Sequence, residues 1–126
     1  MKIHDFDKER EVTNPGDLEI ILKTRFAPGY NGFWICHEYR YPCISILVKD
    51  NLAYAHYFPA EGHPGFRSIG NLTTLEGEIT EFRLDTIHQK QEILNDAVIP
   101  FSAALTVARD FFHSKDLPQS IKWLEL

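Results

Sequence analysis

The sequence predicts an α+β fold, in which an N-terminal and a C-terminal helix frame an antiparallel β-sheet meander. Three segments rich in aromatic and β-branched residues follow one another between residues 33 and 58, separated by turn signals. Apolar residues recur at helical spacing both before and after this region. A length of 126 residues fits a single domain, with no linker, internal repeat or low-complexity tract.

The first helix is predicted from its start signals. Asn14 can cap it, Pro15 suits its first turn, and Asp17 favours the positive end of the helix dipole. Its apolar positions repeat at helical spacing: Leu18, Ile21, Leu22 and Phe26. Pro28-Gly29 is expected to end it, and Glu9–Thr13 before it alternates weakly, which indicates a short first strand.

The meander is predicted from three segments, Phe33–Tyr39, Cys43–Val48 and Leu52–Phe58. Lys49-Asp50-Asn51 indicates a tight reversal between the second and third segments. After the meander, His63–Gly70 is punctuated by Gly and Pro and is expected to hold one more short strand.

The remaining chain returns from strand to helix. Glu76–Leu84 is acidic and alternates imperfectly, which indicates an edge strand or exposed ribbon, and Glu92–Ile99 is a further candidate strand. A helix should begin near Pro100 and end before Pro118. Its apolar stripe consists of Phe101, Ala104, Leu105, Ala108, Phe111 and Phe112.

The formal net charge is −5, and both halves of the chain carry an excess of acidic side chains. An acidic surface repels the phosphates of nucleic acids and membranes but attracts basic proteins. We therefore expect a basic protein partner, no nucleic acid and no membrane, and a monomer or weak dimer. The longest apolar run, Cys43–Val48, is far shorter than the roughly 20 residues that span a bilayer. The polar start Met1–Asp5 lacks a signal peptide, so we expect a cytoplasmic location.

One segment contains the residue types of a zinc site. Cys36-His37-Glu38 and Pro42-Cys43 contain the residue types of a zinc deaminase, which uses H-x-E followed by P-C-x-x-C. The spacing does not match, because His37 and Glu38 are adjacent and no second cysteine follows Cys43 at the required distance. We expect no metal and no cofactor. Although the two cysteines can come close on adjacent strands, a cytosolic setting favours free, buried thiols.

No other catalytic motif is present. The six histidines are scattered without an H-x-H or H-x-x-x-H pair, and the chain has neither a G-x-S-x-G elbow nor a glycine-rich phosphate loop. The sequence therefore does not predict an enzyme. A weakly recognisable enzyme that works through Glu and His residues stays open as an alternative.

Aromatic and acidic residues provide the candidates for a binding surface. Because side chains on a strand alternate between two faces, half of the meander's aromatic residues must face the core and half can be exposed. Exposed Tyr and Trp beside acidic groups are typical of protein interfaces, whereas carboxylates in series are often a solvated strand face, and both interpretations stay open. The candidate partner-binding residues are Tyr39, Tyr54, His56, Phe58, Glu61, Phe66, Glu76 and Glu78.

The order of these features resembles a bacterial immunity-protein family. Tyr41-Pro42 enters an apolar strand, Leu52–Tyr57 follows a polar turn, and Ser68–Asn71 follows the meander. The C-terminal pattern carries most of the resemblance: Ala103-Ala104, Ala108, Phe111-Phe112, Pro118, Ile121, Trp123, Glu125 and Leu126. It looks like the immunity proteins encoded beside polymorphic toxins, particularly deaminase toxins. The match covers about residues 30–126, and Pro100 departs from it by standing where a helix cap is expected.

The resemblance implies that residues 1–126 form one immunity-protein-like domain that binds its cognate toxin and blocks the toxin's active site. The family's Trp and Glu carry over to Trp123 and Glu125, for which we favour a structural role, because a buried anchor is the commoner use of Trp. The alternative is a small-molecule-binding or regulatory α+β domain that uses the aromatic meander as a pocket.

Overall fold

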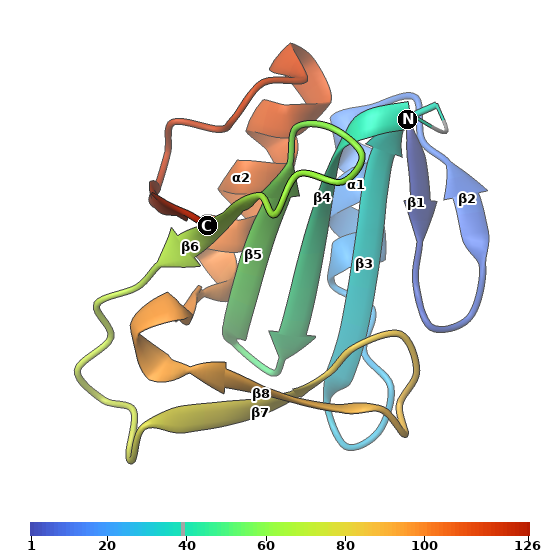
Figure 1. Ribbon diagram of the computed structural model, residues 1–126. Coiled ribbons are helices and arrows are strands. Elements are labelled where there is room, and N and C mark those ends of the chain that lie inside the picture. The colour runs from blue at the N-terminus through green and yellow to red at the C-terminus, as the bar shows by residue number, and fades with distance from the viewer. Residues whose placement is uncertain (39) are drawn as a thin grey trace.

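The computed structural model describes residues 1–38 and 40–126, and its framework is an antiparallel sheet (Figure 1). Within these residues the sheet has eight strands in the order β10-β6-β5-β4-β3-β1-β2, and β9 pairs with the free end of β5. These strands are β1 (Lys2–His4), β2 (Glu9–Glu11), β3 (Tyr30–His37), β4 (Arg40–Lys49), β5 (Leu52–Phe58), β6 (Phe66–Ile69), β9 (Ile99–Pro100) and β10 (Lys122–Glu125). The predicted meander is β3-β4-β5, so the α+β prediction is confirmed.

Helix α1 (Pro15–Leu22) begins where the sequence predicts and ends earlier. The Asn14 side chain accepts a hydrogen bond from the backbone N–H of Asp17 at 2.9 Å. The prediction that the helix continues to Pro28-Gly29 is wrong. Phe26 and Tyr30 exchange backbone hydrogen bonds of 2.8 Å, so the chain has already reversed toward β3.

Helix α2 (Phe101–Ser114) begins without a capping side chain, because Pro100 occupies the cap position. The backbone N–H of Phe101 instead donates to the carbonyl of Asn51 at 2.8 Å, so the β4–β5 turn satisfies a donor that the helix leaves unpaired. Lys115 ends the helix in the left-handed conformation, at φ 63°. Among the described residues, no helix combines the length and apolar character needed to cross a membrane.

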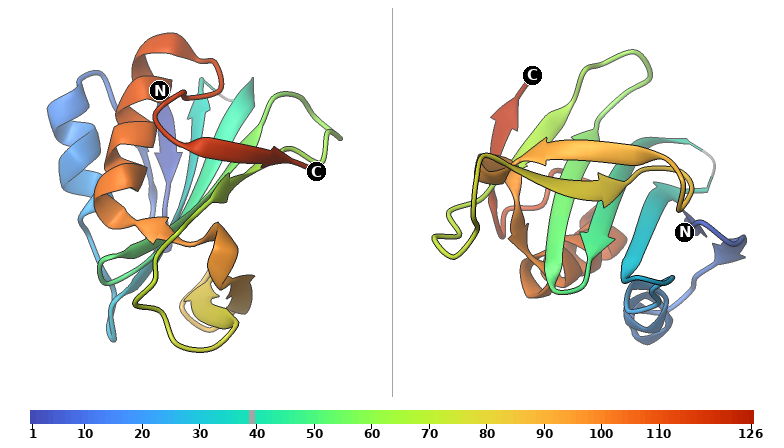
Figure 2. Two further views of the ribbon diagram at one scale, coloured as in Figure 1. Left: turned by 90° about the vertical axis from the view of Figure 1, so that its left-hand side faces the viewer. Right: turned by 90° about the horizontal axis from the view of Figure 1, so that it is seen from below.

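Both helices pack on one face of the sheet and form the main core with it (Figure 2). On β3, β4 and β5, alternate residues point toward the helices, as the pleat of a strand requires. These inward side chains are Phe33, Ile35, Ile44, Ile46, Val48, Ala53, Ala55 and Tyr57, all of them buried. The helices contribute Leu18, Ile21, Leu22, Ala104, Val107, Ala108 and Phe111.

The opposite face of the sheet is only partly covered. A separate two-stranded hairpin, β7 (Ile79–Arg83) and β8 (Lys90–Leu94), crosses it at the end near the β4–β5 turn (Figures 1 and 2). A second, smaller core holds the hairpin there and consists of Leu47, Phe82, Ile93, Ala97 and Val98. The ribbon expected over Glu76–Leu84 thus contains β7, one of the two strands of the hairpin that covers part of the open sheet face.

Cys36 and Cys43 form a disulfide, so the expectation of free thiols is wrong. The two residues are directly opposed in the β3–β4 ladder, and their Cα atoms are 4.4 Å apart. This separation is typical of a pair of residues that do not hydrogen-bond to each other across an antiparallel ladder, where side chains come closest. The register of β3 and β4 brings the two thiols together, and the spacing of the cysteines in the sequence does not contain this register.

The C-terminal tail forms β10 and extends the sheet beside β6. Trp123 is half-buried, packs against the main core, and its indole N–H donates to the carbonyl of Pro118 at 2.7 Å. Glu125 is exposed. The contacts of Trp123 suit the structural role favoured for it, which stays a prediction, whereas Glu125 lies at the surface.

Gly70 directly follows β6 and contacts the segment that comes after the β7–β8 hairpin. Its backbone N–H donates to the carbonyl of Asp96 at 2.7 Å, and a Cβ atom at this position would overlap the carbonyl of Val98. This close approach fixes the hairpin against the sheet.

We therefore expect Gly70→Ala to destabilise the protein by about 3 kcal/mol, because backbone atoms must move apart. The control is Gly77→Ala, whose Cβ would meet nothing within 4 Å and whose cost of about 1 kcal/mol comes only from its positive φ. Urea unfolding of both variants measures the difference. A Gly70→Ala variant no less stable than Gly77→Ala would contradict this description of the junction.

Candidate partner-binding site

The open face of the meander carries a row of polar and aromatic side chains that lie side by side. In the strand ladders Trp34 is opposite Ser45, and Ser45 is opposite His56. All three point away from the helices, since their neighbours along each strand face the main core. Tyr54 and Phe58 lie on the same face of β5, two residues to either side of His56.

The aromatic rings on this face contact one another. The ring centroids of Trp34 and Phe58 are 5.3 Å apart with a tilt of 47°, and Tyr41 meets Trp34 edge-on at 6.3 Å. The imidazole of His56 stacks on Phe58 at 4.0 Å with nearly parallel planes. Trp34 and Tyr41 keep 37% and 41% of their surface exposed, so the aromatic cluster is in contact with solvent.

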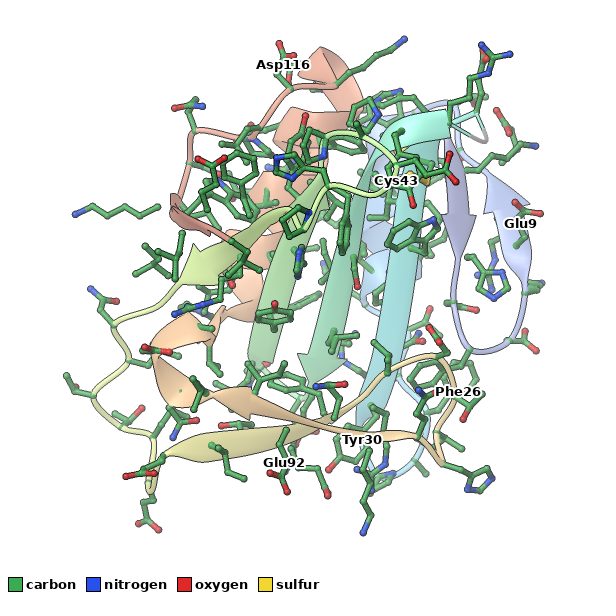
Figure 3. All side chains as sticks on the ribbon, in the orientation of Figure 1. Glu9, Phe26, Tyr30, Cys43, Glu92 and Asp116 are labelled. Carbon is green, nitrogen blue, oxygen red and sulfur yellow. A yellow bond between two sulfur atoms is a disulfide. The ribbon has the colours of Figure 1, made fainter. Side chains whose placement is uncertain are left out.

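Two adjoining hollows in this face form what we call the sheet groove. The larger has a volume of about 280 Å³, and the smaller, of about 170 Å³, shares Trp34, Ser45, Leu47, Leu84 and Asp85 with it. Their further lining residues are His4, Asp5, Gly32, Phe33, Tyr54, His56, Phe58, Gln91 and Ile93. In Figure 3 this face extends from the disulfide of the labelled Cys43 to the hairpin that carries Glu92.

The two hydrogen bonds of His56 select one tautomer of its neutral ring. Its Nε2 lies 2.8 Å from the carbonyl of Pro64, which can only accept, so Nε2 carries the hydrogen. In the neutral ring Nδ1 then accepts from the hydroxyl of Tyr54 at 3.0 Å. Burial lowers the pKa of His56 below its usual value of 6.5, although the Pro64 carbonyl opposes this shift. Burial likewise raises the pKa of the Tyr54 hydroxyl, which favours the donor form.

The structure brings together three of the sequence-predicted candidates, Tyr54, His56 and Phe58. Glu61 is exposed in the β5–β6 loop, and Phe66 points to the other face, where it packs against the main core. The other acidic candidates, Glu76 and Glu78, are exposed before β7 and do not line the groove, and Tyr39 lies outside the described residues.

Trp34 and Asp85 line the groove and were not among the predicted candidates. One signal for Trp34 was available. Ser45 is the only polar residue in the apolar run Cys43–Val48, which marks the less buried face of β4. The strand register places Trp34 beside Ser45. Asp85 had no comparable signal, because only the fold brings the β7–β8 turn to this face.

The segment that imitates a zinc deaminase has a structural role. Cys36 and Cys43 are bonded to each other, and His37 Nε2 donates to the carbonyl of Phe111 at 2.9 Å. The desolvation of His37 lowers its pKa despite this acceptor. Across residues 1–38 and 40–126, no three His, Cys, Asp or Glu side chains are placed to hold a metal ion.

A larger depression, of about 700 Å³, lies on the helix side between Arg25, Asp50 and Phe101. The Arg25 guanidinium is already engaged there, since it donates to the carbonyl of Leu22 at 2.6 Å and lies 4.3 Å from the centre of the Phe101 ring. Arg25 also donates to the carbonyl of Asp50 at 3.2 Å, so it joins the end of α1, the β4–β5 turn and α2. We therefore assign this depression a structural role and retain the sheet groove as the candidate site.

Comparison with known proteins bears out the resemblance seen in the sequence. No protein-family model matches the chain. A curated relative, the double-stranded DNA deaminase immunity protein of Burkholderia cenocepacia (strain H111), is 27% identical over 127 residues, which covers all of both chains. The chain is therefore similar along its whole length to an immunity protein of a deaminase toxin system.

The lowered pKa of His56 makes the groove sensitive to acid. Because the unfolded chain binds a proton at His56 more readily than the folded protein does, stability is full above about pH 6.5 and falls as the pH drops toward the lowered pKa. Urea unfolding should therefore give a smaller free energy of unfolding at pH 5.5 than at pH 7.5.

His56→Gln should reduce this loss, and the contribution of His37 should remain. The control variant is His88→Gln, which removes an exposed histidine outside the groove. Equal acid destabilisation in the wild type and in His56→Gln would contradict the hydrogen-bond arrangement described for His56.

Proposed function

We propose that this chain is an immunity protein that binds a cognate bacterial toxin, a deaminase acting on nucleic acid, and inhibits it by covering its active site with the sheet groove. The full-length similarity to a double-stranded DNA deaminase immunity protein supports the class of partner. The exposed aromatic cluster in the groove is the observation that carries the choice of surface.

The composition of the groove suits a protein contact. Interfaces derive most of their binding energy from a few aromatic or arginine residues in a well-packed centre. Trp34 and Phe58 are held in place by ring contacts on a rigid sheet, so little conformational entropy is lost when a partner covers them. Tyr41 contacts Trp34, the Pro64 carbonyl accepts from His56, and Glu61 is exposed in the same loop as Pro64, so these three are candidate peripheral contacts.

The net charge of the chain supports a toxin that acts on nucleic acid as the partner. A protein that acts on nucleic acid needs a basic surface to bind phosphates, and this chain carries a net charge of −5. Complementary charge accelerates association and disfavours wrong partners. Inhibition by coverage needs no chemistry from the inhibitor, so the proposal includes neither a catalytic role nor a cofactor.

The volume of the larger hollow favours one alternative, a small-molecule-binding domain. At about 280 Å³ it approaches the lower end of ligand pockets, and Tyr54, His56 and Gln91 offer polar groups. A protein that bound a metabolite in this hollow and did not bind a toxin domain would favour this alternative.

The proposed function requires a cognate toxin, which we expect to be encoded beside this gene, and the central test uses the domain of that toxin. Ser45→Arg places a long side chain at the middle of the groove and leaves the main core unchanged. We expect it to weaken binding at least 100-fold, or about 3 kcal/mol, and to abolish protection of cells that express the toxin. Calorimetric titration and a growth assay measure the two effects.

Thr13→Arg is the matched control, because it adds the same charge at an exposed residue that does not line the groove. It should bind and protect like the wild type. Tight binding by a folded Ser45→Arg variant would show that the toxin contacts another surface, and failure of the wild type to bind would reject the proposed function.

A further inference from the structure

We propose that the sheet groove contains a subsite for one arginine side chain of the toxin, formed by the indole of Trp34 and the carboxylate of Asp85. This inference rests on the proposed function, and it specifies which chemical group the groove receives. Trp34 and Asp85 come from β3 and from the turn of the β7–β8 hairpin, and together they line both hollows.

Asp85 is the available carboxylate of the groove. It is exposed, and among residues 1–38 and 40–126 it has no ion-pair partner. Asp5, the other acidic lining residue, is buried and already bound, with Arg10 at 3.2 Å and the backbone N–H of Asp7 at 2.8 Å. A cation that enters the groove therefore meets Asp85.

The hairpin acid nearest to Asp85 in sequence is also occupied. The carboxylate of Glu81 lies 2.9 Å from the guanidinium of Arg83 and 4.0 Å from the ammonium of Lys90. These contacts lower the pKa of Glu81, chiefly through the hydrogen bond from Arg83. Residues of the hairpin thus neutralise Glu81, whereas Asp85 lines the groove without an ion-pair partner among the described residues.

The turn that carries Asp85 is held by hydrogen bonds on both sides. The backbone N–H of Leu84 donates to the carbonyl of Gln89 at 2.9 Å, and the side chain of Arg83 donates to the carbonyl of Ile87 at 2.8 Å. A carboxylate on an ordered turn loses less entropy when it binds a cation than one on a free loop.

The combination of groups favours arginine over lysine. A guanidinium is planar, stacks on an aromatic ring, and donates hydrogen bonds to a carboxylate from its edge, whereas an ammonium is a compact and strongly hydrated charge. Tryptophan is the best aromatic partner for a cation. No lysine or arginine of the described residues lines either hollow. Arg67, which is opposite His56 in the β5–β6 ladder, forms an ion pair with Asp96 at 3.5 Å.

The test compares two variants that each remove one negative charge. Asp85→Asn should weaken binding of the toxin domain about 10- to 100-fold, since it leaves the guanidinium without its counter-charge. Asp116→Asn, the same change at an exposed acid after α2 that does not line the groove, should weaken binding less than about 2-fold. An equal loss of toxin affinity in the two variants would mean that Asp85 acts only through general charge attraction, and this result would overturn the proposal.

A second measurement identifies the cation. Each arginine and lysine on the toxin surface is changed to alanine, and its effect on binding is measured against wild-type and Asp85→Asn protein. One arginine should show a coupling of at least about 10-fold with Asp85. Coupling to a lysine, or to no residue, would overturn the arginine subsite, and the wild-type affinity measured in parallel shows whether the proposed function itself holds.

Discussion

The register of the β3-β4-β5 meander is the constraint on which the rest of the structure depends. With a side-chain period of two, one register sends Phe33, Ile46 and Ala55 to the helices and sends Trp34, Ser45 and His56 to the opposite face. A slip of one residue would exchange the core and the groove. The disulfide between Cys36 and Cys43 fixes the same register covalently, at the end of the meander opposite to the β4–β5 turn.

The position of the groove follows from the pairing along the edge of β5 that does not face β4. Strand β6 pairs with Tyr57 and His56, and β9 pairs with Leu52 and Ala53. The segment between β6 and β9 must therefore leave the sheet and return, and its hairpin crosses the open face. The hairpin covers one end of the meander and leaves the aromatic end open, so the position of the groove is a consequence of topology.

The sequence predicts the elements better than it predicts the site. Period-two and helical patterns locate β3, β4, β5 and α2, because these elements bury a continuous apolar face. The end of α1 depends on the turn in which Phe26 and Tyr30 pair, and the disulfide depends on the register of β3 and β4; the apolar pattern of the sequence contains neither. Tyr54, His56 and Phe58 were found because they lie on one strand, whereas Trp34 depends on the register and Asp85 on the path of the hairpin.

The claim that the toxin covers the sheet face opposite the helices is tested most directly by amide hydrogen exchange of the protein alone and in complex with the toxin domain. Coverage of this face should add protection in the β5–β6 loop and in the turn between β7 and β8, which border the groove. Protection confined to α1 and α2, with no change in those two segments, would contradict it.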